Sequence, residues 1–352
     1  MAEQAAANEM ITDSTEWRGP DMAGCGDWFH ILSDGHVDEV ARALAGITGK
    51  GLELGAFGKD DFPLPSLTHE LAWVQEQLQT GPGFAILRGF PVADYTDAEL
   101  RLIYWGMAQH LGTPMAQSRH GDILGDVRDI GGTTQAEHGR GYTGKDELSF
   151  HADGCDVTGL FCIKVAKKGG LSRLVSAAAA HNEIARRRPD LLAVLYQPFY
   201  WSHRGQELPG SPPHYPQPVF AIKQGHFVAR FLKSHIEWGH KSAGVAMTAE
   251  QIEALELFEA VTHDPDLVLE KEFEPGDLQF SNNLKVFHAR TEFEDHADPA
   301  RKRHLLRIWL SVPNSPPLPE SFQAYYREIG AGQVRGGNQA WQSTTFKTTE
   351  TV

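Results

Sequence analysis

The stretch Leu148-Ser-Phe-His-Ala-Asp153 decides how the fold is interpreted, because apolar and polar residues alternate along it. A period of two residues is typical of a half-buried strand, and it places Ser149, His151 and Asp153 on one face. On such a face, His151 and Asp153 can hold one metal ion from the same side. His288 lies later in the chain, ahead of an arginine-rich segment. Two imidazoles and one carboxylate form the ligand set of a non-haem Fe(II) centre, which leaves half of the coordination sphere open.

The His-x-Asp/Glu spacing is weak evidence by itself. With 17 histidines and 46 acidic residues in 352 positions, about two such pairs are expected by chance, but the chain has six. They are His36/Asp38, His120/Asp122, His151/Asp153, His181/Glu183, His235/Glu237 and His296/Asp298. The spacing must therefore be judged together with the local structure that surrounds each pair.

Local sequence argues against most of the other pairs. His36 and His181 lie in helix-forming sequence, and the side chains of residues two apart diverge on a helix. His296 lies in a polar segment that is typical of a loop. Two alternatives stay open. His120 lies in a glycine-rich stretch that could be strand or turn, and His235 would compete with His151 if residues 231–238 were extended.

Composition limits the class of protein and of partner. A chain of 352 residues with 41% hydrophobic residues can bury a large core, and we expect one elaborated domain. The formal charge of −14 and the pI near 5.6 argue against nucleic acids and anionic membranes, which require a basic surface. A small-molecule partner is therefore expected.

The cysteines and the start of the chain bear on location. Cys25, Cys155 and Cys162 are odd in number and lack a paired spacing, which favours packing roles in a reducing compartment. Residues 1–10 have neither the basic segment nor the apolar core of a signal peptide, and no apolar run of eighteen residues occurs. We expect a cytoplasmic protein.

Periodicity and capping signals predict a mixture of helices and short strands. Helices are expected near residues 37–45, 66–80, 96–111, 176–196 and 248–261, and strands near 84–90, 148–153, 159–165, 171–175, 278–283, 286–291 and 303–312. The pattern predicts a mainly β fold with helices (α+β), specifically a double-stranded β-helix (jelly roll) core with a helical scaffold. The glycine-rich segment 112–144 is expected to border the active site.

Three regions are expected along the chain. Residues 1–20 are small and polar and predict a flexible arm, and residues 21–330 predict a single jelly-roll domain with helical insertions. Residues 331–352 predict a C-terminal tail or a lid that folds back over the site.

Two arginines accompany the candidate ligands. In the expected strand at 303–312, Arg303, Arg307 and Trp309 share one face. An iron oxygenase that uses 2-oxoglutarate needs a cation for the far carboxylate of this cosubstrate, and an arginine fork supplies it well. Two arginines that point into one pocket imply anionic groups there.

In these residues the chain resembles the TauD/TfdA (taurine dioxygenase-like) family of Fe(II)- and 2-oxoglutarate-dependent dioxygenases. Four separated motifs carry the resemblance in the order of the family, and it extends roughly over residues 84–312. They are Phe150-His-Ala-Asp153, Lys168-Gly-Gly-Leu-Ser172, Asn282-Asn-Leu-Lys-Val-Phe-His288-Ala-Arg-Thr291 and Arg303-His-Leu-Leu-Arg307.

The resemblance implies a role for each matching residue. His151, Asp153 and His288 would be the iron ligands. The carboxylate of Asp153 argues against halogenation, because the related halogenases lack this ligand and bind halide in its place. Ser172 would offer its hydroxyl to 2-oxoglutarate. Arg303 would bind the same cosubstrate.

The remaining two positions concern the substrate. Arg307 would bind either the cosubstrate or an anionic substrate, because Arg303 and Arg307 could exchange these two roles. Trp309 shares the face of Arg307 and is the candidate aromatic residue for the substrate.

The resemblance also implies an activity. An enzyme of this kind uses Fe(II), 2-oxoglutarate and O2 to oxidise, by default to hydroxylate, an unactivated C–H bond of a small metabolite, with release of succinate and CO2. The two arginines allow this metabolite to be anionic. Family resemblance also favours a homo-oligomer. A cupin-like isomerase or sensor without oxygenase activity is the alternative, while the lack of a His-Glu-x-x-His cluster counts against a zinc hydrolase.

Overall fold

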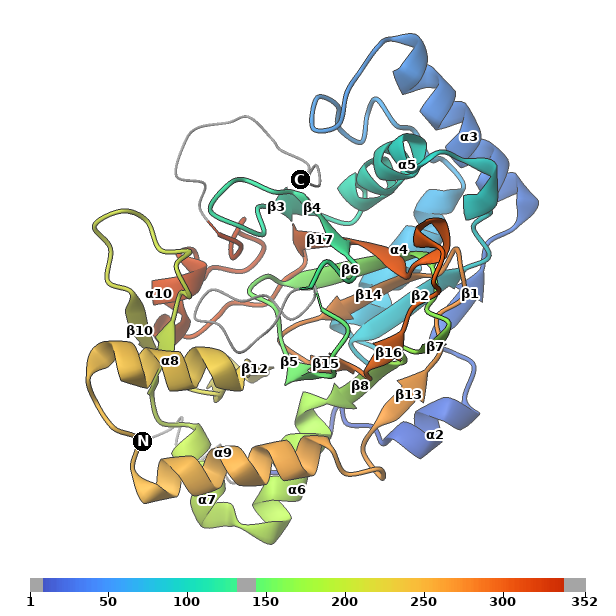
Figure 1. Cartoon of the computed structure of the whole chain (residues 1–352). Helices are drawn as coiled ribbons and strands as arrows, with labels where there is room; N and C mark the ends of the chain where they lie inside the picture. Colours follow the sequence, from blue (N-terminus) through green and yellow to red (C-terminus); the bar gives the residue numbers. More distant parts are fainter. Residues whose placement is uncertain (1–8, 132–143, 339–352) are drawn as a thin grey trace.

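The computed structural model describes residues 9–131 and 144–338, and two β-sheets face each other at its centre (Figure 1). The larger sheet has the strand order β1-β2-β14-β6-β17-β3, with β4 also pairing with β17. Only β1 and β2 pair in parallel. The strands are β1 (Phe29–Ile31), β2 (Phe84–Arg88), β3 (Thr113–Met115), β4 (Leu124–Val127), β6 (Val157–Lys164), β14 (Leu278–Asn282) and β17 (His304–Ser311).

The smaller sheet is antiparallel, with the order β13-β8-β15-β5. Its strands are β13 (Leu269–Lys271), β8 (Ser172–Ser176), β15 (Val286–Arg290) and β5 (Leu148–His151). Short two-stranded ladders extend this core: β7 (Lys168–Gly169) with β16 (Phe293–Glu294), β9 (Phe199–Ser202) with β10 (His214–Gln217), and β11 (Phe220–Lys223) with β12 (His226–Ala229).

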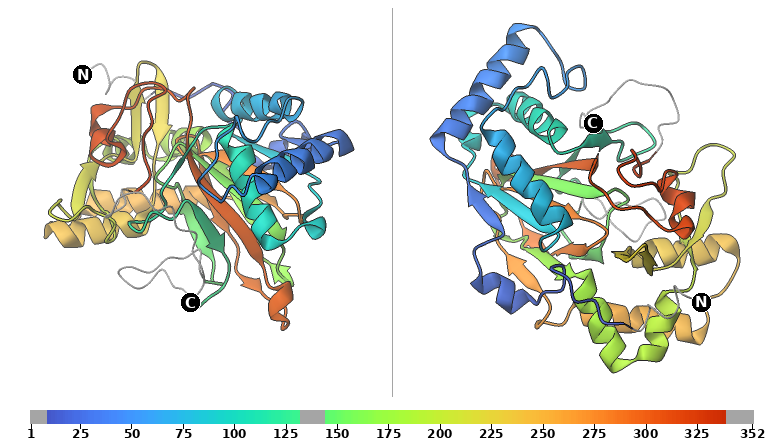
Figure 2. Two further views of the ribbon diagram at one scale, coloured as in Figure 1. Left: turned by 90° about the horizontal axis from the view of Figure 1, so that it is seen from above. Right: turned by 180° about the vertical axis from the view of Figure 1, so that it is seen from behind.

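Helices cover the outer faces of both sheets, as the views from above and behind show (Figure 2). On the larger sheet, α3 (Asp34–Gly49), α4 (Leu67–Gln79) and α5 (Asp97–Gln109) share one apolar core with its outward side chains. On the smaller sheet, α6 (Ala177–Arg187), α7 (Pro189–Leu195) and α9 (Ala249–Thr262) share a second core. The expected jelly-roll core with a helical scaffold is confirmed.

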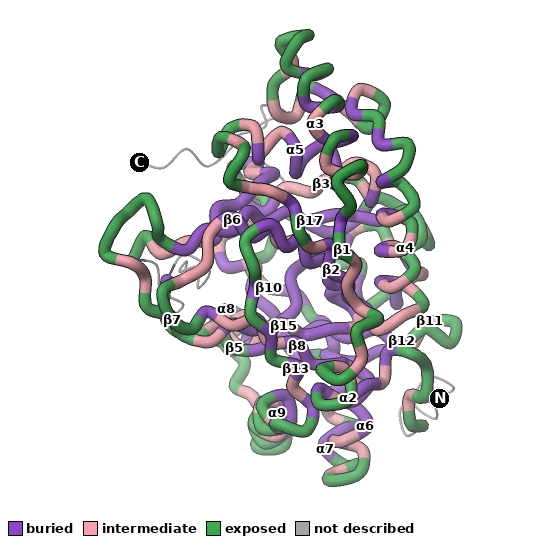
Figure 3. Tube along the Cα trace, turned by 90° about the vertical axis from the view of Figure 1, so that its right-hand side faces the viewer, coloured by how far each residue is buried: buried purple, intermediate pink, exposed green. Residues whose placement is uncertain are grey.

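Further helices and 3-10 turns stand outside these two groups. They are α2 (Gly19–Gly24), α8 (Lys233–Ala243), α10 (Gln323–Tyr326) and the 3-10 turns η1 (Val92–Asp94), η3 (Pro299–Arg301) and η4 (Glu320–Phe322). Buried segments follow the strands in the middle of the molecule, and exposed segments follow the outer turns (Figure 3). No helix within the described ranges has both the length and the apolar character needed to span a bilayer.

Helix starts follow the capping signals in the sequence. Thr96 and Glu99 form a capping box at α5, and Thr248 and Gln251 form another at α9. Ser66 precedes α4 but its side chain makes no capping bond; the Glu39 carboxylate accepts hydrogen bonds from the first backbone N–H groups instead. The four apolar residues at helical spacing in α4 are all buried, as their period predicts.

The alternative at His235 is wrong, because residues 233–243 form α8 and do not form a strand. On a helix, His235 and Glu237 cannot hold one ion from one side. The glycine-rich segment also differs from expectation, since it contains the short strands β3 and β4, both paired with β17. Residues 132–143 of that segment lie outside the described residues.

Both ends of the described chain pack on the body. Trp17 is buried against Phe84, and its indole N–H donates to the Pro82 carbonyl at 2.8 Å. The described part of the expected arm is therefore anchored from about residue 11, where the Ile11 N–H donates to Asn182. The division into an arm, a single domain and a tail stays a prediction.

A buried ion pair anchors the C-terminal segment. Arg335 and Asp156 are fully buried, with Arg335 Nε 2.7 Å from Asp156 Oδ1. The second carboxylate oxygen accepts hydrogen bonds from Ser311 and from the backbone of Val312. Gly337 N–H donates to the Gly154 carbonyl at 2.7 Å, so the segment lies against the loop that follows β5.

We expect Arg335→Met to destabilise the protein by about 3–5 kcal/mol, because it leaves Asp156 buried without its counter-ion. Urea unfolding measures this loss. Lys167→Met is the control, since it breaks an exposed pair with Glu294 that contributes at most about 1 kcal/mol. Equal losses in the two variants would contradict the stabilising role of the buried pair.

Candidate metal centre

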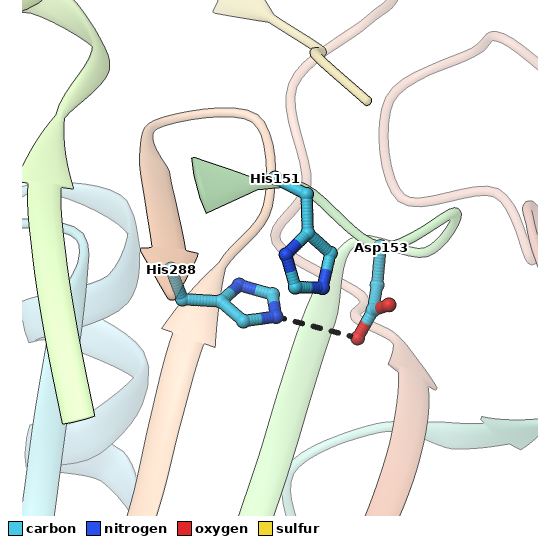
Figure 4. A group of neighbouring side chains, drawn as sticks. All are labelled: His151, Asp153 and His288. Carbon is cyan, nitrogen blue, oxygen red and sulfur yellow. Dashed lines mark ion pairs between the residues drawn. The ribbon is translucent and has the colours of Figure 1, made fainter. Parts of the chain in front are cut away.

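The structure brings His151, Asp153 and His288 together between the two sheets (Figure 4). His151 on β5 pairs directly with His288 on β15, and their ring centroids are 4.3 Å apart. One potential ligand atom from each of the three residues lies within 4.8 Å of the others. In the described parts of the chain, no second group of three histidine, cysteine or acidic side chains is this close.

Asp153 lies just past the end of the observed strand, although the strand was expected to extend over residues 148–153. β5 ends at His151, and the Ala152 N–H donates to the Phe231 carbonyl at 2.8 Å, away from β15. The Asp153 N–H then donates to Asn283 Oδ1 at 3.0 Å. These two bonds hold the turn that directs the Asp153 carboxylate toward the histidines.

Hydrogen bonds prepare the three side chains for a metal ion. His151 Nδ1–H donates to the Ser149 carbonyl at 2.9 Å, which leaves the lone pair of Nε2 free to coordinate. Asp153 Oδ2 accepts hydrogen bonds from the Thr158 hydroxyl at 2.8 Å and from Trp309 Nε1–H at 3.0 Å. Such outer contacts fix the orientation of metal ligands.

Sequence reasoning missed part of this supporting network. Asn283 Nδ2–H donates to Thr158 Oγ1 at 3.0 Å, so one side chain links the backbone of Asp153 to a partner of its carboxylate. Asn283 belongs to the quoted histidine motif, but its role was not assigned there. Nothing in the sequence around Thr158 distinguishes it from an ordinary strand residue.

Burial and charge set the protonation of the cluster. Burial lowers the pKa of both histidines, to about 3 for His288, so both are neutral near pH 7. Burial alone would raise the pKa of Asp153. The Arg307 guanidinium opposes this effect, since its Nη1 is 3.6 Å from Asp153 Oδ1, and the two histidines add to the opposition. Together they hold the pKa of Asp153 below its usual value. Two neutral imidazoles and one carboxylate are the forms that bind a divalent ion.

Arg307 and Trp309 both adjoin the carboxylate of Asp153. Arg307 Nε–H donates to Gln117 Oε1 at 2.7 Å, and Gln117 Nε2–H returns a bond to the Arg307 carbonyl at 2.9 Å. Gln117 lies in the segment that was expected to border the site, although no role was predicted for this residue. The role of either β17 residue toward a substrate stays a prediction.

Arg303 lies deeper between the sheets, directly before β17. Its side chain packs over the Phe293 ring, and burial lowers its pKa to about 10. Its Nη1 has no hydrogen-bond partner among the residues that the structure describes. Ser172 lies on β8 and its hydroxyl donates to Gln279 Oε1 of the opposite sheet at 3.2 Å. A buried guanidinium with an unused donor is suited to an anion.

Comparisons with known proteins agree with this geometry. The family described as "Taurine catabolism dioxygenase TauD, TfdA family" matches residues 47–309. FR-33289 synthase of Streptomyces rubellomurinus is 31% identical over 319 residues, which cover 90% of this chain and 94% of that protein. The taurine hydroxylase-like protein SAT17 of Stachybotrys chartarum is 28% identical over 85% of this chain and 79% of its own length.

A solved structure shares the fold. Asparagine oxygenase, in a complex with Fe(II), 3-hydroxyasparagine and succinate, superimposes with a TM-score of 0.63 at 20% identity. The superposition covers 81% of this chain and 93% of asparagine oxygenase. The common architecture therefore extends well beyond the strands that carry the three candidate ligands.

We expect Trp309→Phe to weaken Co(II) binding about 10-fold, because it removes a hydrogen bond that orients Asp153. The change is measured by anaerobic titration of the Co(II) absorption bands. Trp105→Phe is the matched control, since its indole N–H donates to the Phe57 carbonyl away from the site. Unchanged Co(II) affinity in Trp309→Phe would show that the bond does not support the metal.

Proposed function

The chain belongs to the taurine catabolism dioxygenase TauD, TfdA family, and from this premise we propose that His151, Asp153 and His288 hold the Fe(II) of a 2-oxoglutarate-dependent hydroxylase. The observation that carries the proposal is the convergence of these three side chains, each supplying a ligand atom within 4.8 Å of the others. The family match decides against a cupin-like isomerase or sensor without oxygenase activity. Dioxygenase activity therefore follows from the family, and the roles of individual residues are the proposal.

The residues present fit iron and 2-oxoglutarate. Two neutral histidines and an ionised aspartate match the facial ligand set of non-haem Fe(II). The unused Nη1 of Arg303 and the hydroxyl of Ser172 match the far carboxylate of 2-oxoglutarate. When bound, iron and 2-oxoglutarate supply the oxidising chemistry, which consumes O2 and releases succinate and CO2.

The protein contributes binding and orientation to this reaction. His151 and His288 hold the metal from adjacent strands, and the hydrogen bonds from Thr158 and Trp309 keep the Asp153 carboxylate in position. Burial limits the access of water to His151 and Asp153, which are almost inaccessible, while His288 is partly exposed. Arg303, on the inner side of the larger sheet, would fix the cosubstrate relative to the metal.

A small anionic molecule is the proposed substrate class. Arg307 lies beside Asp153, closer to the metal ligands than the Arg303 position that suits the cosubstrate. An anionic group on the substrate would draw this guanidinium partly away from Asp153. Trp309 is proposed to serve the substrate indirectly, through its bond to Asp153. Asparagine oxygenase was solved with a hydroxylated amino acid, so a protein of this fold accommodates a small molecule.

Four further expectations stay proposals. A homo-oligomeric state and a cytoplasmic location are proposed on family resemblance and sequence composition. The lack of nucleic-acid and membrane partners is proposed on the formal charge of −14. The single jelly-roll domain over residues 21–330 is proposed with them.

Anaerobic titration of the apoprotein with Fe(II) and then 2-oxoglutarate tests the function. We expect a weak visible charge-transfer band in the unmutated protein and no band in His151→Ala, which lacks one ligand. His296→Ala is the matched control, because His296 has the same spacing to an aspartate but lies in a loop away from the cluster. If Fe(II) binds and no band follows 2-oxoglutarate, the proposed function is wrong.

A further inference from the structure

A buried lysine lies near the proposed cosubstrate pocket and has no assigned role. Lys271 ends β13, is only 9% exposed, and its Nζ has no hydrogen-bond partner among the described residues. An ammonium group in such a place costs stability unless something pairs with it. The sequence around it, Leu269-Glu-Lys-Glu272, gives no sign of burial.

The register of the smaller sheet shows where Lys271 points. Lys271 pairs directly with Ser172 across β13 and β8, so both side chains project from the same face. The Ser172 hydroxyl donates to Gln279 of the larger sheet, which identifies this face as the one turned toward the interior. Lys271 therefore enters the space between the sheets beside the residue expected to contact 2-oxoglutarate.

Asp277, the acid whose charge acts most on Lys271, is already paired. Asp277 accepts two hydrogen bonds from Arg88, at 2.8 and 2.9 Å, and a third from the backbone of Glu274 at 3.0 Å. Lys271 Nζ instead lies 3.8 Å from the centroid of the Phe273 ring. A cation–π contact alone leaves the hydrogen-bonding capacity of the ammonium unused.

Lys271 and Arg303 approach one region of the interior from different sheets. Cys162 lies on the inner face of β6, opposite Leu305 of β17. Burial raises the pKa of the Cys162 thiol to about 12, and the positive charges of Arg303 and Lys271 both oppose this rise. Both cations thus act on the same buried thiol, and each has a nitrogen without a hydrogen-bond partner among the described residues.

We propose that Lys271 is a second cationic ligand for the far carboxylate of 2-oxoglutarate, acting together with Arg303 and Ser172. The inference rests on the proposed function. His288 pairs with Leu174, two residues along β8 from Ser172, so the hydroxyl lies about 7 Å along the strand from the metal ligand. This separation suits a five-carbon dicarboxylate, and a carboxylate has enough acceptor positions for a guanidinium, an ammonium and a hydroxyl.

Two ligands that differ only at the far end test the proposal. Anaerobic Fe(II)-protein is titrated with 2-oxoglutarate and with 2-oxovalerate, which has a methyl group in place of the far carboxylate. Lys271→Met should weaken 2-oxoglutarate binding about 10-fold or more, and leave 2-oxovalerate binding within about twofold, because only the charged end meets the lysine. Lys271→Arg, which keeps the charge, should recover part of the lost affinity.

The control and a stability readout separate ligand binding from a structural role. Lys241→Met removes an exposed ammonium that also lies over an aromatic ring, 4.0 Å from Trp238, and should change neither affinity. The melting temperature of apo Lys271→Met should be equal to or above that of the unmutated protein, because a buried charge without a partner is removed. A structural lysine would give the reverse, a lower melting temperature with unchanged preference for 2-oxoglutarate.

The outcomes distinguish the inference from the function on which it rests. If Lys271→Met weakens the binding of both ligands equally, or of neither, the proposed role of Lys271 is wrong. The proposed function still holds in that case, provided that the unmutated protein gives the normal charge-transfer band. No band in the unmutated protein would remove both. If Lys271→Met does not fold, ¹³Cε-lysine spectra of the unmutated Zn(II) protein decide, since 2-oxoglutarate but not 2-oxovalerate should shift the resonance of the buried lysine.

Discussion

The direct pairing of His151 with His288 across β5 and β15 is the constraint on which the site depends. Residues that face each other in an antiparallel ladder have side chains close together on the same side, so two histidines far apart in sequence meet without any loop to place them. A shift of one residue in this register would turn one imidazole to the opposite face. The smaller sheet therefore determines the candidate metal centre, and the outer helices support it by covering the face away from the three side chains.

Much of this arrangement could be predicted from local sequence. The alternation around His151 indicated the correct strand, and the capping boxes at Thr96 and Thr248 indicated the starts of α5 and α9. The helix at His235 was ambiguous for a physical reason: its N-cap is Leu232, whose side chain makes no capping bond, so no start signal precedes it. β3 and β4 were missed because they are stabilised mainly by pairing with β17, a contact that local propensity cannot report.

The supporting residues of the site were less predictable. Gln117 matters only because β17 brings the distant Arg307 to it. Thr158 is close to Asp153 in sequence, but it reaches the carboxylate only because the chain turns between β5 and β6. Lys271 stands among acidic residues that suggest a solvated segment, and burial of this lysine follows from the position of β13 beside β8. The overall charge of −14 also says nothing about the interior, where Arg303, Arg307 and Lys271 outnumber the acid of the metal cluster. The net charge of the chain therefore does not predict the charges that surround the candidate site.

The contact between the C-terminal segment and the loop after β5 has a consequence for the order of events during synthesis. Asp156 is three residues beyond Asp153, and its partner Arg335 is separated from it by 179 positions. Tyr325 also lies so close to Gly154 that a side chain at that position would collide with its hydroxyl. The loop bearing the aspartate ligand reaches its final form only when nearly the whole chain has left the ribosome. The candidate metal site would therefore stay incomplete until the C-terminal segment has packed against this loop.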